Sequence, residues 1–179
     1  MPHCYHQRSV NLRPAAFTDA RDVANVHVLT WQTAYRDIVP DTYLDTLSAE
    51  KRELLWRQAI SKGTPELWVA EAEGVITGFV AFGPSRDSDG SADTGEIEAI
   101  YVLPAYWGTR TGYGLWCIAQ QRFAERGFVS VTLWVLKENL RATRFYESLG
   151  FEAESASEKD IRIGGRALKE IRYARNLGR

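Results

Sequence analysis

The fold is decided by the stretch IEAIYVLPAYWGTRTGYGL, residues 97–115. An apolar strand runs up to Pro104, a short turn with glycines follows, and a helical pattern begins near Thr111. A helix start leaves backbone N–H groups unpaired, and the helix dipole favours negative charge there. The stretch therefore predicts an anion site at a strand–helix junction, where phosphates bind without needing a basic side chain.

Two common phosphate motifs do not describe this turn. It lacks the Gly-Lys-Ser/Thr ending of a P-loop, and it lacks the GxGxxG spacing and the downstream acid of a dinucleotide fingerprint. On their own, these residues are equally compatible with an ordinary tight strand-to-helix connection. If the turn binds phosphate, another phosphate-bearing cofactor is needed.

A second stretch, LWVLKENLRATRFYESLGF at residues 133–151, reads as a strand, an Asn at a helix start and a short helix that ends at Gly150. Together the two stretches resemble the GNAT superfamily of acyl-CoA-dependent N-acetyltransferases. Members carry a strand ending in Val-x-Pro, a loop of the form Gln/Arg-x-x-Gly-x-Gly/Ala, and Asn-x-x-Ala-x-x-Phe-Tyr-x-x-x-Gly-Phe. The last motif is matched by Asn139, Ala142, Phe145, Tyr146, Gly150 and Phe151.

The resemblance spans nearly the whole chain, since residues 12–20 also look like the opening strand and helix of the superfamily. At 179 residues the chain suits one domain. We expect a single GNAT domain over residues 1–179, with residues 1–8 disordered. The expected fold is α+β: a mostly antiparallel mixed sheet of about seven strands, splayed in the middle and flanked by about four helices. Residues 151–162 and 167–173 are expected to form the last antiparallel pair.

The composition excludes several classes of protein. The formal net charge is -1, from 22 basic and 23 acidic residues, which gives no electrostatic footprint for nucleic acid. The two cysteines do not suggest a disulfide framework, and the sequence shows no Cys/His cluster that would indicate a metal site. With no secretory signal and no apolar run of membrane-spanning length, a cytoplasmic protein without a membrane partner is expected.

The resemblance implies acetyl-CoA as co-substrate, with backbone hydrogen bonds from residues 100–102 to the pantetheine arm and amides of residues 107–112 around the pyrophosphate. Trp107 stands where the superfamily has Gln or Arg. Arg110 stands at the first glycine, which normally allows close approach and positive φ; its side chain either weakens coenzyme binding or adds a phosphate contact. The expected coenzyme-binding residues are Ile100, Tyr101, Val102, Trp107, Gly108, Thr109, Arg110, Thr111, Gly112, Tyr113, Asn139, Ala142 and Tyr146.

Three residues are the candidates for catalysis. The resemblance implies that Tyr146 protonates the coenzyme A sulfur, although its spacing also suits a core ring. Strand alternation places Glu96, Glu98, Ile100 and Val102 on one face, so both carboxylates could face the acceptor. The resemblance favours Glu96 as the base; alternatively, both acids only attract a cationic acceptor or lie at a wet edge.

The sequence indicates less about the acceptor substrate than about the coenzyme. Trp31 and Tyr35, together with Glu98, are the candidate acceptor-binding residues, because aromatic rings beside acids suit a cationic amine; the rings suit a core equally well. The predicted function is acetyl transfer from acetyl-CoA to a primary amine of a small molecule by direct attack. A protein N-terminus of the ribosomal-protein type is an alternative acceptor, and an acyl-CoA-binding module without turnover is an alternative function. Members of the superfamily often form homodimers, so a homodimer is predicted as a possible assembly.

Overall fold

The computed structural model describes residues 10–178. The strands are β1 (Asn11–Pro14), β2 (Glu66–Ala72), β3 (Val75–Pro84), β4 (Thr94–Val102), β5 (Ser130–Leu136), β6 (Glu152–Ala153), β7 (Lys159–Ile163) and β8 (Arg166–Asn176). The α-helices are α1 (Ala20–Ala34), α2 (Asp41–Leu44), α3 (Ala49–Lys62), α4 (Thr111–Glu125) and α5 (Leu140–Ser148). Short 3-10 helices span Phe17–Asp19, Pro104–Tyr106 and Ser155–Ser157.

One eight-stranded sheet runs through the molecule in the order β1-β2-β3-β4-β5-β8-β6, and β7 pairs with β8. All neighbours are antiparallel except β4 and β5. Helices α1 and α3 cover one face of the β2–β4 part, where they enclose an apolar cluster around Phe79. Helices α4 and α5 pack on the opposite face, around Phe82 and Phe123.

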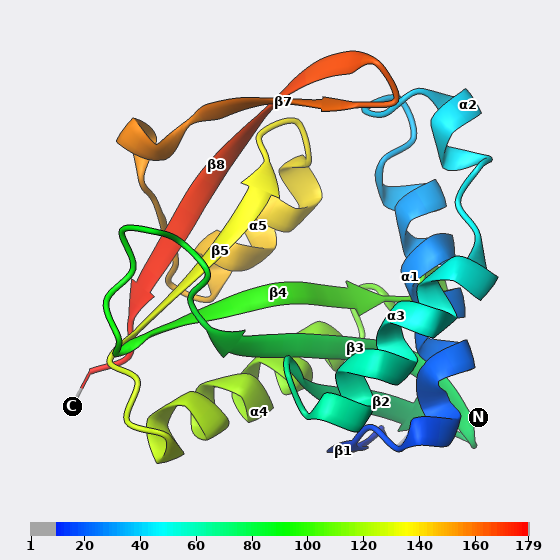
Figure 1. Ribbon diagram of the computed structural model, residues 1–179, viewed down its shortest axis with the longest axis horizontal. Coiled ribbons are helices and arrows are strands. Elements are labelled where there is room, and N and C mark those ends of the chain that lie inside the picture. The colour runs from blue at the N-terminus through cyan, green and yellow to red at the C-terminus, as the bar shows by residue number, and fades with distance from the viewer. Residues whose placement is uncertain (1–9, 179) are drawn as a thin grey trace, which may run out of the picture.

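The sheet opens between β4 and β5. These two strands pair over only three positions, Thr94–Glu96 with Ser130–Thr132. Beyond them the strands diverge, with α5 beside the opening (Figure 1). At the junction, a Cβ on Gly95 would lie 2.3 Å from Phe123 Cε1, so glycine lets the Phe123 ring of α4 pack directly against the backbone. The free edge of β4 and the start of α5 become walls of one opening.

The far side of this opening is spanned by the β7–β8 hairpin. Its apolar side chains join those of α2 in a cluster that includes Leu44 and Leu168. At the hairpin tip, Arg166 donates to the backbone oxygen of Asp37 at 3.0 Å. The hairpin and α2 therefore meet where the two halves of the sheet are farthest apart (Figure 1).

The expected architecture, a splayed and mostly antiparallel sheet with flanking helices, is confirmed, with eight strands and five α-helices rather than about seven and four. The single strand expected over residues 151–162 is wrong. The chain turns after Ala153, where Ser157 N–H donates to Glu154 O, and Arg172 of β8 holds the side chains of both residues. The expected disorder of residues 1–8 lies outside the described residues. In the part of the chain that is described, no helix has the length and apolar character needed to cross a bilayer.

Candidate active site

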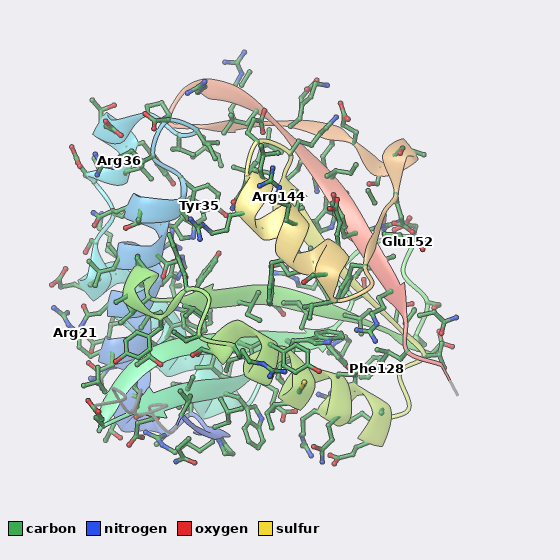
Figure 2. All side chains as sticks on the ribbon, turned by 180° about the vertical axis from the view of Figure 1, so that it is seen from behind. Arg21, Tyr35, Arg36, Phe128, Arg144 and Glu152 are labelled. Atoms are coloured by element: carbon green, nitrogen blue, oxygen red, sulfur yellow. The ribbon has the colours of Figure 1, made fainter. Side chains whose placement is uncertain are left out.

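A cavity of about 810 Å³ occupies the opening between β4 and β5. Its walls come from β4, the loop before α4, the first turn of α4, β5, α5 and the end of α1. In Figure 2, Tyr35 from α1 and Arg144 from α5 lie on facing sides of the gap. The volume is typical of a site for a small molecule. The predicted site residues that line it are Tyr35, Glu98, Ile100, Tyr101, Val102, Trp107, Gly108, Arg110, Gly112, Tyr113, Asn139, Ala142 and Tyr146.

The first turn of α4 forms one end of the cavity. Its N-cap residue, Arg110, makes no side-chain capping bond, so the first N–H groups of a fifteen-residue helix face the cavity end uncapped. Arg110 has φ 67 and Gly108 has φ 76, so the loop needs the left-handed conformation at both positions. A Cβ on Gly112 would lie 3.3 Å from Phe145 Cζ and 3.8 Å from Val102 Cγ2. Glycine there keeps the space between β4 and α5 open.

Three arginines line the same cavity. Arg110, Arg141 and Arg144 all line it, and none of them forms an ion pair within residues 10–178. The Arg141 guanidinium lies 3.8 Å above the centroid of the Trp107 ring, which is itself fixed because Nε1 donates to Val102 O at 2.7 Å. A positive charge thus stands beside Trp107 although the loop carries no Gln or Arg there. Free guanidinium groups around a helix N-terminus suit the phosphates of the expected coenzyme A.

The free edge of β4 forms the middle of the cavity. Past Glu96, no described strand pairs with the side of β4 that faces β5. An extended ligand such as a pantetheine arm can lie along an unpaired strand edge and use its backbone groups. The Val102 carbonyl is already taken by Trp107, and it also accepts from Thr30 Oγ1 at 3.3 Å.

A bulge in β4 changes which way its side chains point. Ala81 pairs with Ala99, but the next residue, Phe82, pairs with Ile97, so Glu98 is an extra residue in β4. The predicted common face for Glu96, Glu98, Ile100 and Val102 is therefore wrong. Ile97 instead shares the α4-side cluster with Ile100 and Val102.

The two acids nevertheless come together, on Arg86 of the β3–β4 loop. Arg86 donates through Nε to Glu96 Oε2 at 3.1 Å and through Nη2 to Glu96 Oε1, and its Nη1 lies 3.1 Å from Glu98 Oε2. The Glu96 side chain is only 3% exposed, whereas that of Glu98 is 19% exposed and lines the cavity. Burial raises the pKa of Glu98, the Arg86 charge opposes that rise, and the Glu96 charge adds to it. Glu98 is therefore the acid that a cavity ligand can reach.

Tyr146 comes from α5 on the opposite wall. Its ring packs beside Phe145 and Phe151, with centroids 5.4 and 5.9 Å away, so the ring belongs to the core as well as to the cavity. Burial raises the pKa of the phenol, which keeps it protonated and able to donate. Asn139 caps α5 by accepting from Ala142 N at 3.2 Å.

Four predicted site residues do not line the cavity. Glu96 lies behind Glu98, against Arg86. Trp31 packs on the Tyr35 ring, with centroids 4.5 Å apart, and so supports the wall from behind. Thr109 and Thr111 bond to each other through their hydroxyls at 2.9 Å within the loop before α4.

The cavity-lining residues that sequence reasoning missed include Trp134, Arg141 and Arg144, and it also missed Arg86, which pairs with both acids. Arg141 and Arg144 lie inside the second motif at variable positions, and a search for cations without nearby acids would have found them. Trp134 faces the cavity from β5, and its Nε1 donates to Asp87 at 3.0 Å. Among the described residues, no group of three or more His, Cys, Asp or Glu side chains is arranged to hold a metal ion.

Comparison with known proteins agrees with this geometry. The model of the acetyltransferase (GNAT) family matches residues 29–151. An uncharacterized N-acetyltransferase of Bacillus subtilis, YuaI, is 34% identical over 163 residues, which cover 90% of each chain. The L-methionine sulfoximine/L-methionine sulfone acetyltransferase of Salmonella typhimurium is 31% identical over 130 residues, covering 73% of this chain and 71% of that protein.

Among solved structures, the PaiA N-acetyltransferase of Thermoplasma acidophilum in complex with coenzyme A superposes with a TM-score of 0.73. It is 20% identical, and the match covers 90% of this chain and 98% of that one, so it shows the same fold. The family match, the extended similarity to YuaI and the cavity at the start of α4 lead to one conclusion. The chain belongs to the GNAT family and is an N-acetyltransferase that uses acetyl-CoA as its co-substrate.

Proposed function

We propose that the protein acetylates a primary amine of a small molecule by direct attack, with Glu98 as the base and Tyr146 as the acid. The observation that carries this proposal is that Glu98 from β4 and Tyr146 from α5 line one cavity, which begins at the N-terminus of α4. The relative from Salmonella typhimurium supports a small acceptor, since its name gives two small amines as its substrates.

Each side chain has a defined task in this proposal. Acetyl-CoA supplies the acetyl group as a thioester. The acceptor ammonium loses one proton to Glu98, which leaves a neutral amine that can attack. The Tyr146 hydroxyl donates a proton to the leaving sulfur, and the second proton, lost by the new amide nitrogen, replaces the one that Tyr146 gave. Glu96 is assigned a supporting role, because both of its oxygens accept from Arg86 and it does not line the cavity. No nucleophilic Cys or Ser is needed.

The coenzyme end is assigned to the loop and the arginines around α4. The uncapped N–H groups at the start of α4, with Arg110, Arg141 and Arg144, hold the phosphates, and the free edge of β4 holds the pantetheine arm. We also propose that residues 1–179 form one GNAT domain. A cytoplasmic location and a homodimer remain predictions from the sequence.

The first test is calorimetric titration with acetyl-CoA and with free coenzyme A, followed by an amine panel read out by thiol release. We expect micromolar binding of both and turnover with small primary amines. If neither coenzyme form binds, the proposed function is wrong. If the coenzyme binds but only peptides are acetylated at their N-termini, the acceptor is a protein.

Arg110 allows the coenzyme end to be tested separately. Arg110→Gly is expected to raise the free energy of unfolding by about 1 kcal/mol, because glycine adopts the left-handed conformation at φ 67 without strain. The same change is expected to weaken coenzyme A binding severalfold, because a phosphate contact is lost. Denaturant unfolding and calorimetry measure the two effects. A gain in coenzyme affinity would instead mean that the natural side chain hinders the loop.

A further inference from the structure

Arg86 presents two bidentate edges, and Glu96 occupies only one of them. Nε and Nη2 form the side edge that grips the two Glu96 oxygens. Nη1 lies 3.1 Å from Glu98 Oε2 and forms an ion pair with it. A guanidinium has five N–H donors in a planar fork and Glu96 takes two of them, so both terminal nitrogens keep N–H donors. The side chain is 62% exposed, so this second edge is open to a ligand.

The loop that carries Arg86 is held in place. Asp87 accepts from Trp134 Nε1 at 3.0 Å, and Arg172 of β8 pairs with Asp87 at 3.1 Å and with Asp89 at 2.7 Å. These contacts tie the β3–β4 loop to the other half of the sheet, beside the cavity wall that Trp134 forms. Arg86 is not itself a lining residue, but it is held beside Glu98, which does line the cavity, before any ligand arrives.

Arg86 and Glu98 offer opposite charges side by side at the acceptor end. An α-amino acid carries its ammonium and its carboxylate on the same carbon, so its two charges are also adjacent. Its carboxylate can pair with Arg86 while its ammonium pairs with Glu98. A simple amine would meet Glu98 but leave the open edge of Arg86 without a partner. Bidentate binding of a carboxylate by arginine is both strong and directional.

We propose that the acceptor is a free α-amino acid or a close analogue, whose carboxylate binds the open edge of Arg86 while its amino group lies against Glu98. This inference rests on the proposed function, because it names the substrate class of the same site. The carboxylate is bound and stays unchanged. Glu98 takes one proton from the ammonium, and the neutral amine nitrogen then forms a bond to the acetyl carbon as the carbon–sulfur bond breaks. Tyr146 gives a proton to the sulfur, and the second nitrogen proton replaces it.

The test compares each proteinogenic L-amino acid, and L-methionine sulfone, with its own α-carboxamide. For the side chains that are accepted, the wild-type kcat/KM is expected to favour the acid by about tenfold to a hundredfold. Arg86→Gln is expected to bring this ratio close to one. Comparing the ratio between wild type and variant cancels the difference in amine basicity, and it also cancels any general loss of activity.

Two further variants control the experiment. Arg36→Gln removes a guanidinium that is as exposed as that of Arg86, at 61%, and that only approaches Asp41 at 4.0 Å. Arg36 lies next to Tyr35 (Figure 2). The acid-to-amide ratio of this variant should keep its wild-type value. Because Arg86 also compensates the buried charge of Glu96, Arg86→Gln combined with Glu96→Gln removes both charges and protects the fold. Its ratio should also be close to one.

Two results would overturn the inference. One is an acid-to-amide ratio that Arg86→Gln leaves unchanged. The other is tight acetyl-CoA binding with no amino acid in the panel acetylated, which would leave the coenzyme site standing and exclude this acceptor class. Failure to bind acetyl-CoA at all is a different outcome, since it would overturn the proposed function itself.

Discussion

Tyr146→Phe is expected to lower kcat by about a hundredfold to a thousandfold and to leave the Kd for coenzyme A unchanged. The phenol is partly buried, which raises its pKa, and it therefore stays protonated until the thiolate needs a proton. Phenylalanine keeps the ring contacts with Phe145 and Phe151 and removes only the donor. Steady-state kinetics with an accepted amine and calorimetry with coenzyme A separate the two effects.

A matched control for this change is Tyr173→Phe. Tyr173 of β8 is buried, but its hydroxyl donates to Glu147 at 3.1 Å and does not line the cavity. Its loss should leave kcat within about twofold of wild type, since removing one partly exposed hydrogen bond changes stability rather than chemistry. If Tyr146→Phe behaves like Tyr173→Phe, Tyr146 is a packing residue and another group protonates the sulfur.

Glu98→Gln is expected to lower kcat/KM by about a hundredfold to a thousandfold and to flatten the acidic limb of the pH–rate profile. A base acts only when deprotonated, so wild-type activity falls as the pH drops through the pKa of Glu98. That pKa lies above its ordinary value because partial burial disfavours the charged carboxylate. The acceptor amine titrates equally in both proteins, so the difference between the two profiles belongs to Glu98.

Glu96→Gln provides the comparison. Its negative charge contributes to the raised pKa of Glu98, so its removal should move the acidic limb to lower pH without abolishing it. An acidic limb that persists in Glu98→Gln and disappears in Glu96→Gln would assign the base to Glu96, as the family resemblance suggested.

The coenzyme half of the molecule was largely predictable from sequence. The strand before Pro104, the glycine-bearing turn and the Asn139 helix start are local patterns, and each folds as its pattern indicates. The demand for positive φ at position 110 was also predictable, because a glycine usually stands there. Arg110 adopts φ 67 in its place.

The acceptor half was predicted less well, for two physical reasons. Period-two alternation assumes an unbroken strand, and the extra residue at Glu98 reverses the faces without leaving a signal in the sequence. The partner of both acids, Arg86, comes from a polar loop, and no spacing rule connects a loop residue to a strand ten positions later. The broken strand after Phe151 has a similar cause, since it depends on Arg172 from a distant strand.

The hairpin that reaches across to α2 has a consequence for the order in which the chain folds. The bond from Arg166 to Asp37 joins residues 129 positions apart, whereas β2 and β3 are joined by a tight turn. Closing a long loop costs more conformational entropy than closing a hairpin, so distant contacts of this kind form late. The contact between the hairpin and α2 is thus completed only after the last strands have been synthesised. A chain still emerging from the ribosome can build the β2–β3 hairpin before this long-range contact exists.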